Sequence, residues 1–143
     1  MKIKIIMLAL SIFILVGCSQ KISESGTKFA NSTVENMLIA QNNNDYDKFA
    51  ENLSSATKKN FTKDEMDKQN KIVNTKIGKY IPNSKKFKQG TKVSQNGKKY
   101  IVIVYDVKYK NESGETTITV TFDDDNKHAI ETFIISSPKL MKK

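Results

Sequence analysis

The strongest constraint on the fold is a change in hydrophobic period at Gly78. Before Gly78, apolar residues recur every three to four positions, as in amphipathic α-helices; after it, they recur every second position, as in β-strands. Helices and strands that separate along a chain indicate an α+β architecture. A chain of 143 residues has room for one such domain. We therefore expect N-terminal helices packed on a curved, four-stranded antiparallel sheet.

Three helices are predicted before Gly78. The first spans about residues 28–43, and its inner face consists of Ala30, Val34, Met37 and Leu38. Asp45 is placed to cap a second, shorter helix. Thr62 and Glu65 have the T-x-x-E spacing of a capping box at the start of the third helix, and the flanking Phe61 and Met66 have the spacing of a hydrophobic staple. Gly78 is a suitable C-terminal stop for it.

Four strands are predicted after Gly78, at about residues 85–95, 100–109, 116–122 and 128–136. Asn96-Gly97 is a strong hairpin signal between the first two strands. Ser113-Gly114 predicts the second turn and residues 123–126 the third. The strand 100–109 is apolar on both faces for most of its length, which indicates a central strand covered on both sides.

Residues 1–18 have the order of features found in a secretion signal. Lys2 and Lys4 precede an apolar run at residues 5–16, which is shorter than the roughly 20 residues of a membrane-spanning helix. The segment Leu15-Val16-Gly17-Cys18 resembles the lipobox of bacterial lipoproteins. By that resemblance, cleavage falls between Gly17 and Cys18, and the Cys18 thiol receives a diacylglyceryl group. Two acyl chains provide stable anchoring.

The predicted organisation follows from this signal. Residues 1–17 are a signal peptide, residues 18–27 a lipidated cysteine with a flexible tether, residues 28–138 the α+β domain and residues 139–143 a basic tail. The predicted location is the extracytoplasmic side of the cell membrane. Because Cys18 is the one cysteine of the sequence, an internal disulfide and a multi-cysteine zinc site are excluded.

The net charge of +9 comes from 24 lysines without a single arginine. It falls to +7 when Lys2 and Lys4 leave with the signal peptide. Arginine is the residue that binds phosphate and guanine in a bidentate way, so its absence argues against nucleic acid as a partner. The partners expected from the charge are anionic lipid head groups or an anionic wall polymer.

Several segments resemble uncharacterised secreted and lipoprotein members of the nuclear transport factor 2-like superfamily, which is also described as cystatin-like. They are NDYDKF at 44–49, IGKY at 77–80, the strand 100–109, and TITVTFDDDNK at 117–127. The resemblance covers roughly residues 28–136 and implies helices on a strongly bent sheet that forms a half-open cone. The superfamily includes isomerases, dehydratases and binding modules, so the resemblance implies a fold more than a function.

Three ionisable residues are weak catalytic candidates: Asp106, Glu131 and His128. Isomerase-like members of the superfamily place an acidic base beside a tyrosine or histidine in the cone. Strand alternation, however, puts Asp106 on the opposite face from Tyr105 and Tyr109. The three aspartates 123–125 could supply oxygen ligands to calcium, but they lack the spacing of an EF-hand loop and fit a hydrogen-bonded turn better.

The leading hypothesis is a lipid-anchored, non-catalytic binding or interaction module without a cofactor. Its ligand is not specified by the sequence. Three helices can cover one face of the sheet. The other face, with Tyr100, Val102 and Val104, is expected to be closed by curvature of the sheet, by the chain termini, or by contact with a protein partner or a second copy. The alternative is a small, cofactor-free isomerase or hydratase that uses a carboxylate in the cone.

Overall fold

The computed structural model describes residues 19–143. The predicted signal peptide, the cleavage site after Gly17 and the lipidation site Cys18 lie outside these residues. Four helices precede the main sheet: α1 Phe29–Asn42, α2 Tyr46–Ala50, α3 Ser55–Asn60 and α4 Lys63–Lys76. The strands are β1 Gln20–Ile22, β2 Lys86–Gln95, β3 Lys98–Tyr109, β4 Glu112–Asp123 and β5 Ile130–Ser136. A 3₁₀ helix at Glu24–Thr27 and the final helix α5 Pro138–Met141 complete the fold.

The predicted α+β class is confirmed, but the sheet has five strands instead of four. Its order is β1-β2-β3-β4-β5, and each neighbouring pair is antiparallel. The additional strand, β1, comes from the segment expected to be a flexible tether, and Gln20 pairs with Lys92. Three residues are too few to show a hydrophobic period, which is why the sequence pattern missed β1.

The turn between β2 and β3 is the predicted one, whereas the turn between β3 and β4 is not. Asn96 and Gly97 have φ values of 51° and 79°, as the tightest hairpin turns require. The second hairpin turns at residues 110–111, so the prediction of a turn at Ser113-Gly114 was wrong. Gly114 lies inside β4, where a Cβ would be 2.7 Å from Pro138 Cγ. This glycine permits the close approach of α5, and it does not form the turn.

Besides the 3₁₀ helix at Glu24–Thr27, which lies in the predicted tether, two α-helices were absent from the prediction. Helix α3 has six residues and is capped by Ser54, whose side chain accepts a hydrogen bond from Thr57 N. Helix α5 occupies part of the predicted basic tail, with Pro138 in its first turn and Ser137 as its cap. Both helices are too short for a periodic pattern, and a side-chain cap at each start is the one local signal for them.

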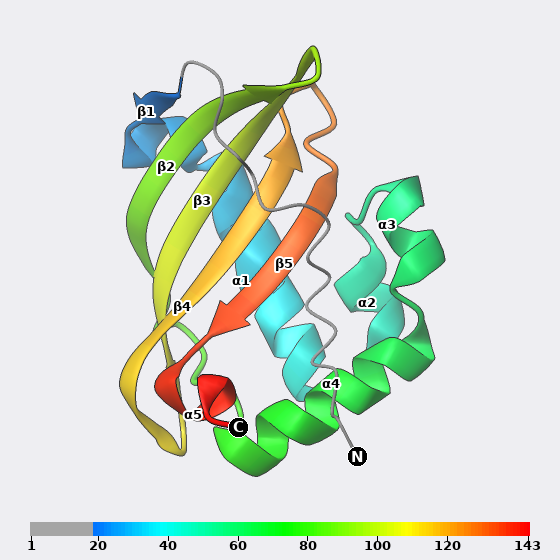
Figure 1. The fold of residues 1–143 in the computed structure, drawn as a ribbon, viewed down its shortest axis with the longest axis vertical. Helices are drawn as coiled ribbons and strands as arrows, with labels where there is room; N and C mark the ends of the chain where they lie inside the picture. Colours follow the sequence, from blue (N-terminus) through cyan, green and yellow to red (C-terminus); the bar gives the residue numbers. More distant parts are fainter. Residues whose placement is uncertain (1–18) are drawn as a thin grey trace.

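Helix α1 lies along one face of the curved sheet, with α2, α3 and α4 beyond the β5 edge and the lower end (Figure 1). The side chains at odd positions of β3 point toward α1 and are at most 5% exposed: Ile101, Ile103, Tyr105, Val107 and Tyr109. The even positions, on the other face, are half-buried or exposed. The core therefore lies between α1 and one sheet face, and it fills the interior of the curved sheet.

Candidate functional site

The sheet face turned away from α1 combines apolar and hydroxyl side chains. The strand register places Val102 of β3 beside Thr121 of β4, and Val104 beside Thr119. On β5, Ile134 pairs with Thr119 and is 37% exposed. The hydroxyl of Thr132 donates a hydrogen bond to that of Thr121 at 2.8 Å. Among residues 19–143, none of the helices α1–α4 packs over this face (Figure 1). We call the half-buried or exposed residues Val102, Val104, Thr117, Thr119 and Ile134 the open sheet face.

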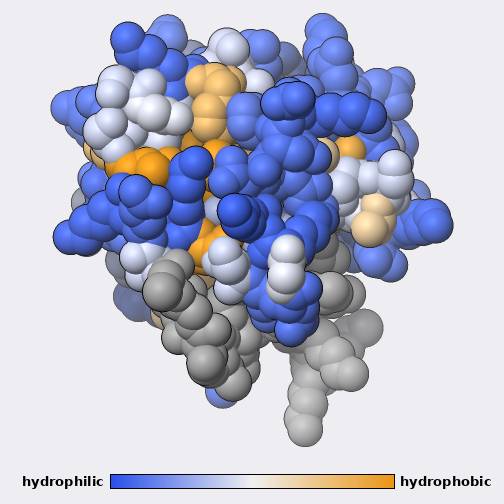
Figure 2. Space-filling model, turned by 90° about the horizontal axis from the view of Figure 1, so that it is seen from above, coloured by the Kyte–Doolittle hydropathy of each residue, from blue (hydrophilic) through white to orange (hydrophobic). Residues whose placement is uncertain are grey.

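A cluster of charged residues lies where β3 begins and β4 ends. Lys98 Nζ is 2.9 Å from Asp123 Oδ1 and 3.3 Å from Glu131 Oε1. Asp123 is only 8% exposed, and its Oδ1 atom has the Lys98 ion pair but no well-directed hydrogen bond. Burial raises the pKa of Asp123, and Lys98 partly opposes that rise. The contact with Asp123 in turn raises the pKa of Lys98. This end of the molecule is mostly hydrophilic at its surface (Figure 2).

Glu131, one of the three catalytic candidates, is anchored within this cluster. Its Oε2 atom accepts hydrogen bonds from Ser54 Oγ at 2.8 Å and Thr57 Oγ1 at 3.3 Å. Burial would raise its pKa, but the hydrogen bonds from Ser54 and Lys98 outweigh burial and lower the pKa. Glu131 is thus kept in its ionised form, and its hydrogen bonds to Ser54 and Thr57 connect β5 to the start of α3.

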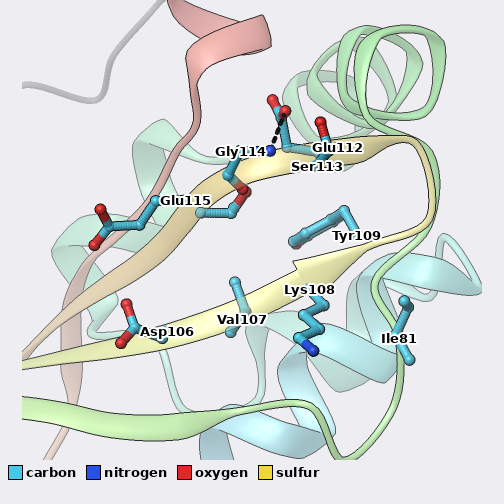
Figure 3. A pocket seen from close by; sticks show the side chains of 10 residues that line it. Ile81, Asp106, Val107, Lys108, Tyr109, Glu112, Ser113, Gly114 and Glu115 are labelled. Carbon is cyan, nitrogen blue, oxygen red and sulfur yellow. Dashed lines mark hydrogen bonds between the residues drawn. The ribbon is translucent and has the colours of Figure 1, made fainter.

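Asp106, the second candidate, lies at an exposed rim. Its carboxylate is 3.2 Å from Lys88 Nζ, and Lys88 also pairs with Glu115. The side chains of Asp106 and Glu115 lie along one side of an open groove of about 530 Å³, with Tyr109 and Ile81 toward the other (Figure 3). An ammonium group shared by two carboxylates in this position forms a solvated ion-pair network.

The tyrosines that could have assisted Asp106 point into the core instead. Tyr105 and Tyr109 are 0% and 3% exposed. Their hydroxyls contact Asn31 Oδ1 at 3.4 Å and Gln41 Oε1 at 3.2 Å. Burial raises the pKa of Tyr105 to about 12. The predicted separation of Asp106 from these tyrosines is confirmed.

His128, the third candidate, belongs to the turn before β5. Its φ of 48° places it in the left-handed region, and its ring stacks on Phe29 with 3.9 Å between the ring centroids. Asp125 Oδ1 accepts hydrogen bonds from the backbone N–H groups of Lys127 and His128, both at 2.9 Å. His128 thus serves to pack α1 against the turn.

The three consecutive aspartates have separate partners. Asp123 pairs with Lys98, Asp124 with Lys92 at 3.4 Å, and Asp125 with the backbone of its own turn. Within residues 19–143, no group of three or more His, Cys, Asp or Glu side chains converges as metal ligands would. The predicted hydrogen-bonded turn is therefore confirmed at Asp125.

Sequence reasoning missed Lys98, Ser54 and Thr57 as members of the charged cluster. Ser54 and Thr57 are three residues apart, which is the spacing of a helix cap and its first turn. That spacing was the available local signal for α3. The contacts of the cluster with Glu131 span more than 70 residues, so they depend on the tertiary fold.

A family model described as "Protein of unknown function (DUF3887)" matches residues 29–129. No curated protein and no solved structure has a significant match to the chain. None of the helices in residues 19–143 has both the length and the apolar character needed to cross a membrane.

Proposed function

The chain belongs to the DUF3887 family of proteins of unknown function, and from that premise we propose that it is a membrane-anchored, extracytoplasmic lipoprotein that acts as a non-catalytic binding module. The anchor is the diacylglyceryl group on Cys18. The motivation is the order of a positive start, a short apolar run and the lipobox-like Leu15-Val16-Gly17-Cys18. Two acyl chains are sufficient for stable attachment to a membrane.

The open sheet face is the observation that carries the binding role. A sheet that buries one face on a helix normally has polar residues on its solvent face. Here Val102 and Val104 lie on that face of β3, and Ile134 lies on β5, with Thr119 of β4 between Val104 and Ile134. Exposed or half-buried apolar side chains on a solvent face suit contact with another molecule. The partner proposed is a protein, either a second copy or another envelope component.

We also propose that the fold is a nuclear transport factor 2-like cone. Support comes from the helices that precede a curved meander and from α1, which runs along the inner face of the sheet (Figure 1). In this chain the interior is occupied by its own side chains, and Tyr80, Tyr105 and Phe122 are among the largest that are fully buried. This packing favours a ligand on the outer face over a small molecule inside the cone.

An isomerase or hydratase role has weaker support. A general base should reach its substrate in a site that excludes water, often with a pKa raised toward neutrality. Asp106 is exposed and paired with Lys88, while the pKa of Glu131 is lowered. His128 is stacked on Phe29. No single observation on residues 19–143 favours proton transfer over binding.

Replacement of Cys18 tests the anchor. Cells that express wild type or Cys18→Ser are labelled with a radioactive fatty acid, and the protein is recovered from membrane and soluble fractions. Wild type should be labelled and membrane-bound, whereas Cys18→Ser should be unlabelled, because a serine hydroxyl is not ionised at neutral pH and cannot form the thioether. Equal labelling of the two proteins would refute the lipoprotein assignment.

Crosslinking tests the open sheet face. A photo-reactive residue at position 104 is compared with one at position 59, an exposed site on α3. A defined crosslinked species should form from position 104 in intact cells and vanish when Val102→Lys is added. Identical products from the two positions would show that the face has no special role.

A further inference from the structure

One end of the molecule is surrounded by lysines. The C-terminal end of α4, the loop after it, the β3–β4 turn and α5 meet there. Asn111 N donates to Ile77 O, Lys110 N donates to Lys79 O, and Lys76 Nζ donates to Lys142 O. We define the basic end as Lys76, Lys79, Lys108, Lys110, Lys139, Lys142 and Lys143. Six of these seven side chains are exposed, and Lys76 is half-buried.

These lysines have little acidic compensation. Within residues 19–143, the ion pairs involve another set of lysines: Lys48, Lys63, Lys68, Lys88, Lys92 and Lys98. Glu112 lies among the seven; its oxygens accept hydrogen bonds from the backbone N–H groups of Gly114 and Lys139, and its carboxylate also interacts electrostatically with the Lys139 ammonium group. The nearby Asp106 and Glu115 share Lys88. All seven lysines of the basic end lie outside this set of ion pairs, so this end of the molecule keeps a concentrated positive charge.

The basic end lies far from the point where the lipid anchor would attach. Gln20, the first residue of β1, pairs with Lys92, and Lys92 pairs with Ile101. Tyr109, beside the basic end, is eight residues further along β3, or about 26 Å at roughly 3.3 Å per residue. Because β1 runs toward the basic end, its first residue, Gln20, is the one farthest from that end. β1 and α5 lie at opposite ends of the long axis (Figure 1).

We propose that the basic end is a docking surface for a soluble linear polyanion of the cell envelope, held at a distance from the membrane that carries the anchor. This proposal rests on the lipid anchor proposed above for its orientation. A multivalent polyanion gains from clustered lysines because each contact releases condensed counterions. The Debye length is only about 8 Å at physiological ionic strength, so charges some 26 Å from the anchored end are screened from that membrane.

Binding of long-chain inorganic polyphosphate to the full-length lipidated protein tests the proposal. The protein is reconstituted in neutral phosphatidylcholine vesicles, and co-sedimentation of labelled polyphosphate is measured at several salt concentrations. The test variant carries Lys79→Gln, Lys108→Gln, Lys110→Gln and Lys142→Gln, at positions where the side chains are exposed. The matched control carries Lys28→Gln, Lys59→Gln, Lys99→Gln and Lys127→Gln, which removes the same charge from exposed sites elsewhere.

Wild type should bind with an affinity that falls as salt rises. The basic-end variant should bind about tenfold more weakly with a smaller salt slope, and the control should stay within about twofold of wild type. Absence of wild-type binding, or equal losses in the two variants, would overturn the proposal. Unchanged thermal melting of both variants verifies that they are folded.

A second binding experiment distinguishes a soluble polymer from a lipid surface as the partner of the basic end. Phosphatidylglycerol vesicles are offered in place of polyphosphate. Capture of these vesicles through the basic end, without polyphosphate binding, would replace the polymer by a second membrane and overturn the proposal.

Fatty-acid labelling of Cys18 is measured separately. If Cys18 is unlabelled, the anchor fails, and polyphosphate binding by the protein in neutral detergent still decides whether the basic end binds polyanions.

Discussion

At the scale of single residues, Lys98 has the most consequential position. Its ammonium group is the counter-ion of Asp123, a carboxylate that is almost entirely buried, and it also reaches Glu131. Removal of one partner from a buried ion pair is costly because the remaining charge is uncompensated. Here Lys98 itself is about half exposed, so water can replace part of the lost interaction.

We predict that Lys98→Met lowers the free energy of unfolding by about 1–2 kcal/mol at pH 7. Burial already raises the pKa of Asp123, and loss of Lys98 raises it further. A group with a raised folded-state pKa destabilises the fold when it is ionised, and this cost vanishes once it is protonated. The difference between variant and wild type should therefore shrink as the pH falls to about 4 and below. Urea unfolding at pH 7 and pH 4 measures it.

The control for this prediction is Lys99→Met, an exposed neighbour that takes no part in the ion pairs of Lys98. It should stay within about 0.5 kcal/mol of wild type at each pH. A loss in Lys98→Met that is independent of pH would mean that packing of the lysine side chain, rather than its charge, is what matters.

At the scale of elements, the start of α4 combines a predicted cap with an unexpected partner. Thr62 has an extended conformation, and its Oγ1 atom accepts from Glu65 N at 3.4 Å. The Thr62 half of the predicted capping box is therefore present. The Glu65 carboxylate, which would complete the box, instead pairs with Lys68 at 3.0 Å. Phe61 and Met66 are both buried, in agreement with the predicted staple.

We predict that Thr62→Ala lowers the free energy of unfolding by about 0.5–2 kcal/mol, because the helix start loses its acceptor. Thr62→Asp should be nearly neutral, since a carboxylate also caps and interacts favourably with the positive end of the helix. Thermal and urea unfolding give both values. Alanine and aspartate variants with equal losses would show that the methyl group of Thr62, not its oxygen, is required.

The attachment of β1 depends on Gly90. A Cβ at this position would be 2.7 Å from Ile22 Cγ1 and 3.2 Å from Ile22 O. We predict that Gly90→Ala displaces β1, lowers the free energy of unfolding by about 1–3 kcal/mol and speeds hydrogen exchange at residues 20–22. Gly26→Ala is the control, because its Cβ would have no neighbour closer than 3.9 Å. Slow exchange at residues 20–22 in Gly90→Ala would contradict this role.

Most elements that sequence reasoning found are long enough for a period to repeat, and the exception is the five-residue α2, which was predicted from its cap, Asp45. Helices α1 and α4 have 14 residues each, and β2, β3 and β4 have 10 to 12. The elements it missed, β1, α3 and α5, have three to six residues and are held by distant contacts. Ser54 with Glu131, and Gly114 with Pro138, are examples of such contacts. Candidate site residues followed the same rule: strand alternation placed Asp106 correctly, while the partners of Glu131 required the fold.

At the scale of the whole molecule, the sheet separates two environments. One face forms the core with α1, and the other bears the open sheet face; along the strands, the end where β1 begins is opposite the basic end (Figure 1). Under the proposed anchor at Cys18, a partner would meet the open sheet face from the side, and a polyanion would meet the end that points away from the membrane. The two proposed contacts use separate surfaces, so variants of one should leave the other intact.

Adjacent residues of β3 provide the sharpest test of the open sheet face. Ile103 is 0% exposed in the core, whereas Val102 is half-buried on the opposite face. A lysine at position 103 buries a charge without a partner and should unfold the domain, whereas a lysine at position 102 reaches solvent and should change the free energy of unfolding by less than about 1 kcal/mol.

If the partner is a second copy, a chain that starts at Ser19 should dimerise with rising concentration in sedimentation experiments. Val102→Lys should then remain a monomer. A wild type that is monomeric at every concentration would assign the face to a different protein, and unfolding by both lysines alike would show that the face is core.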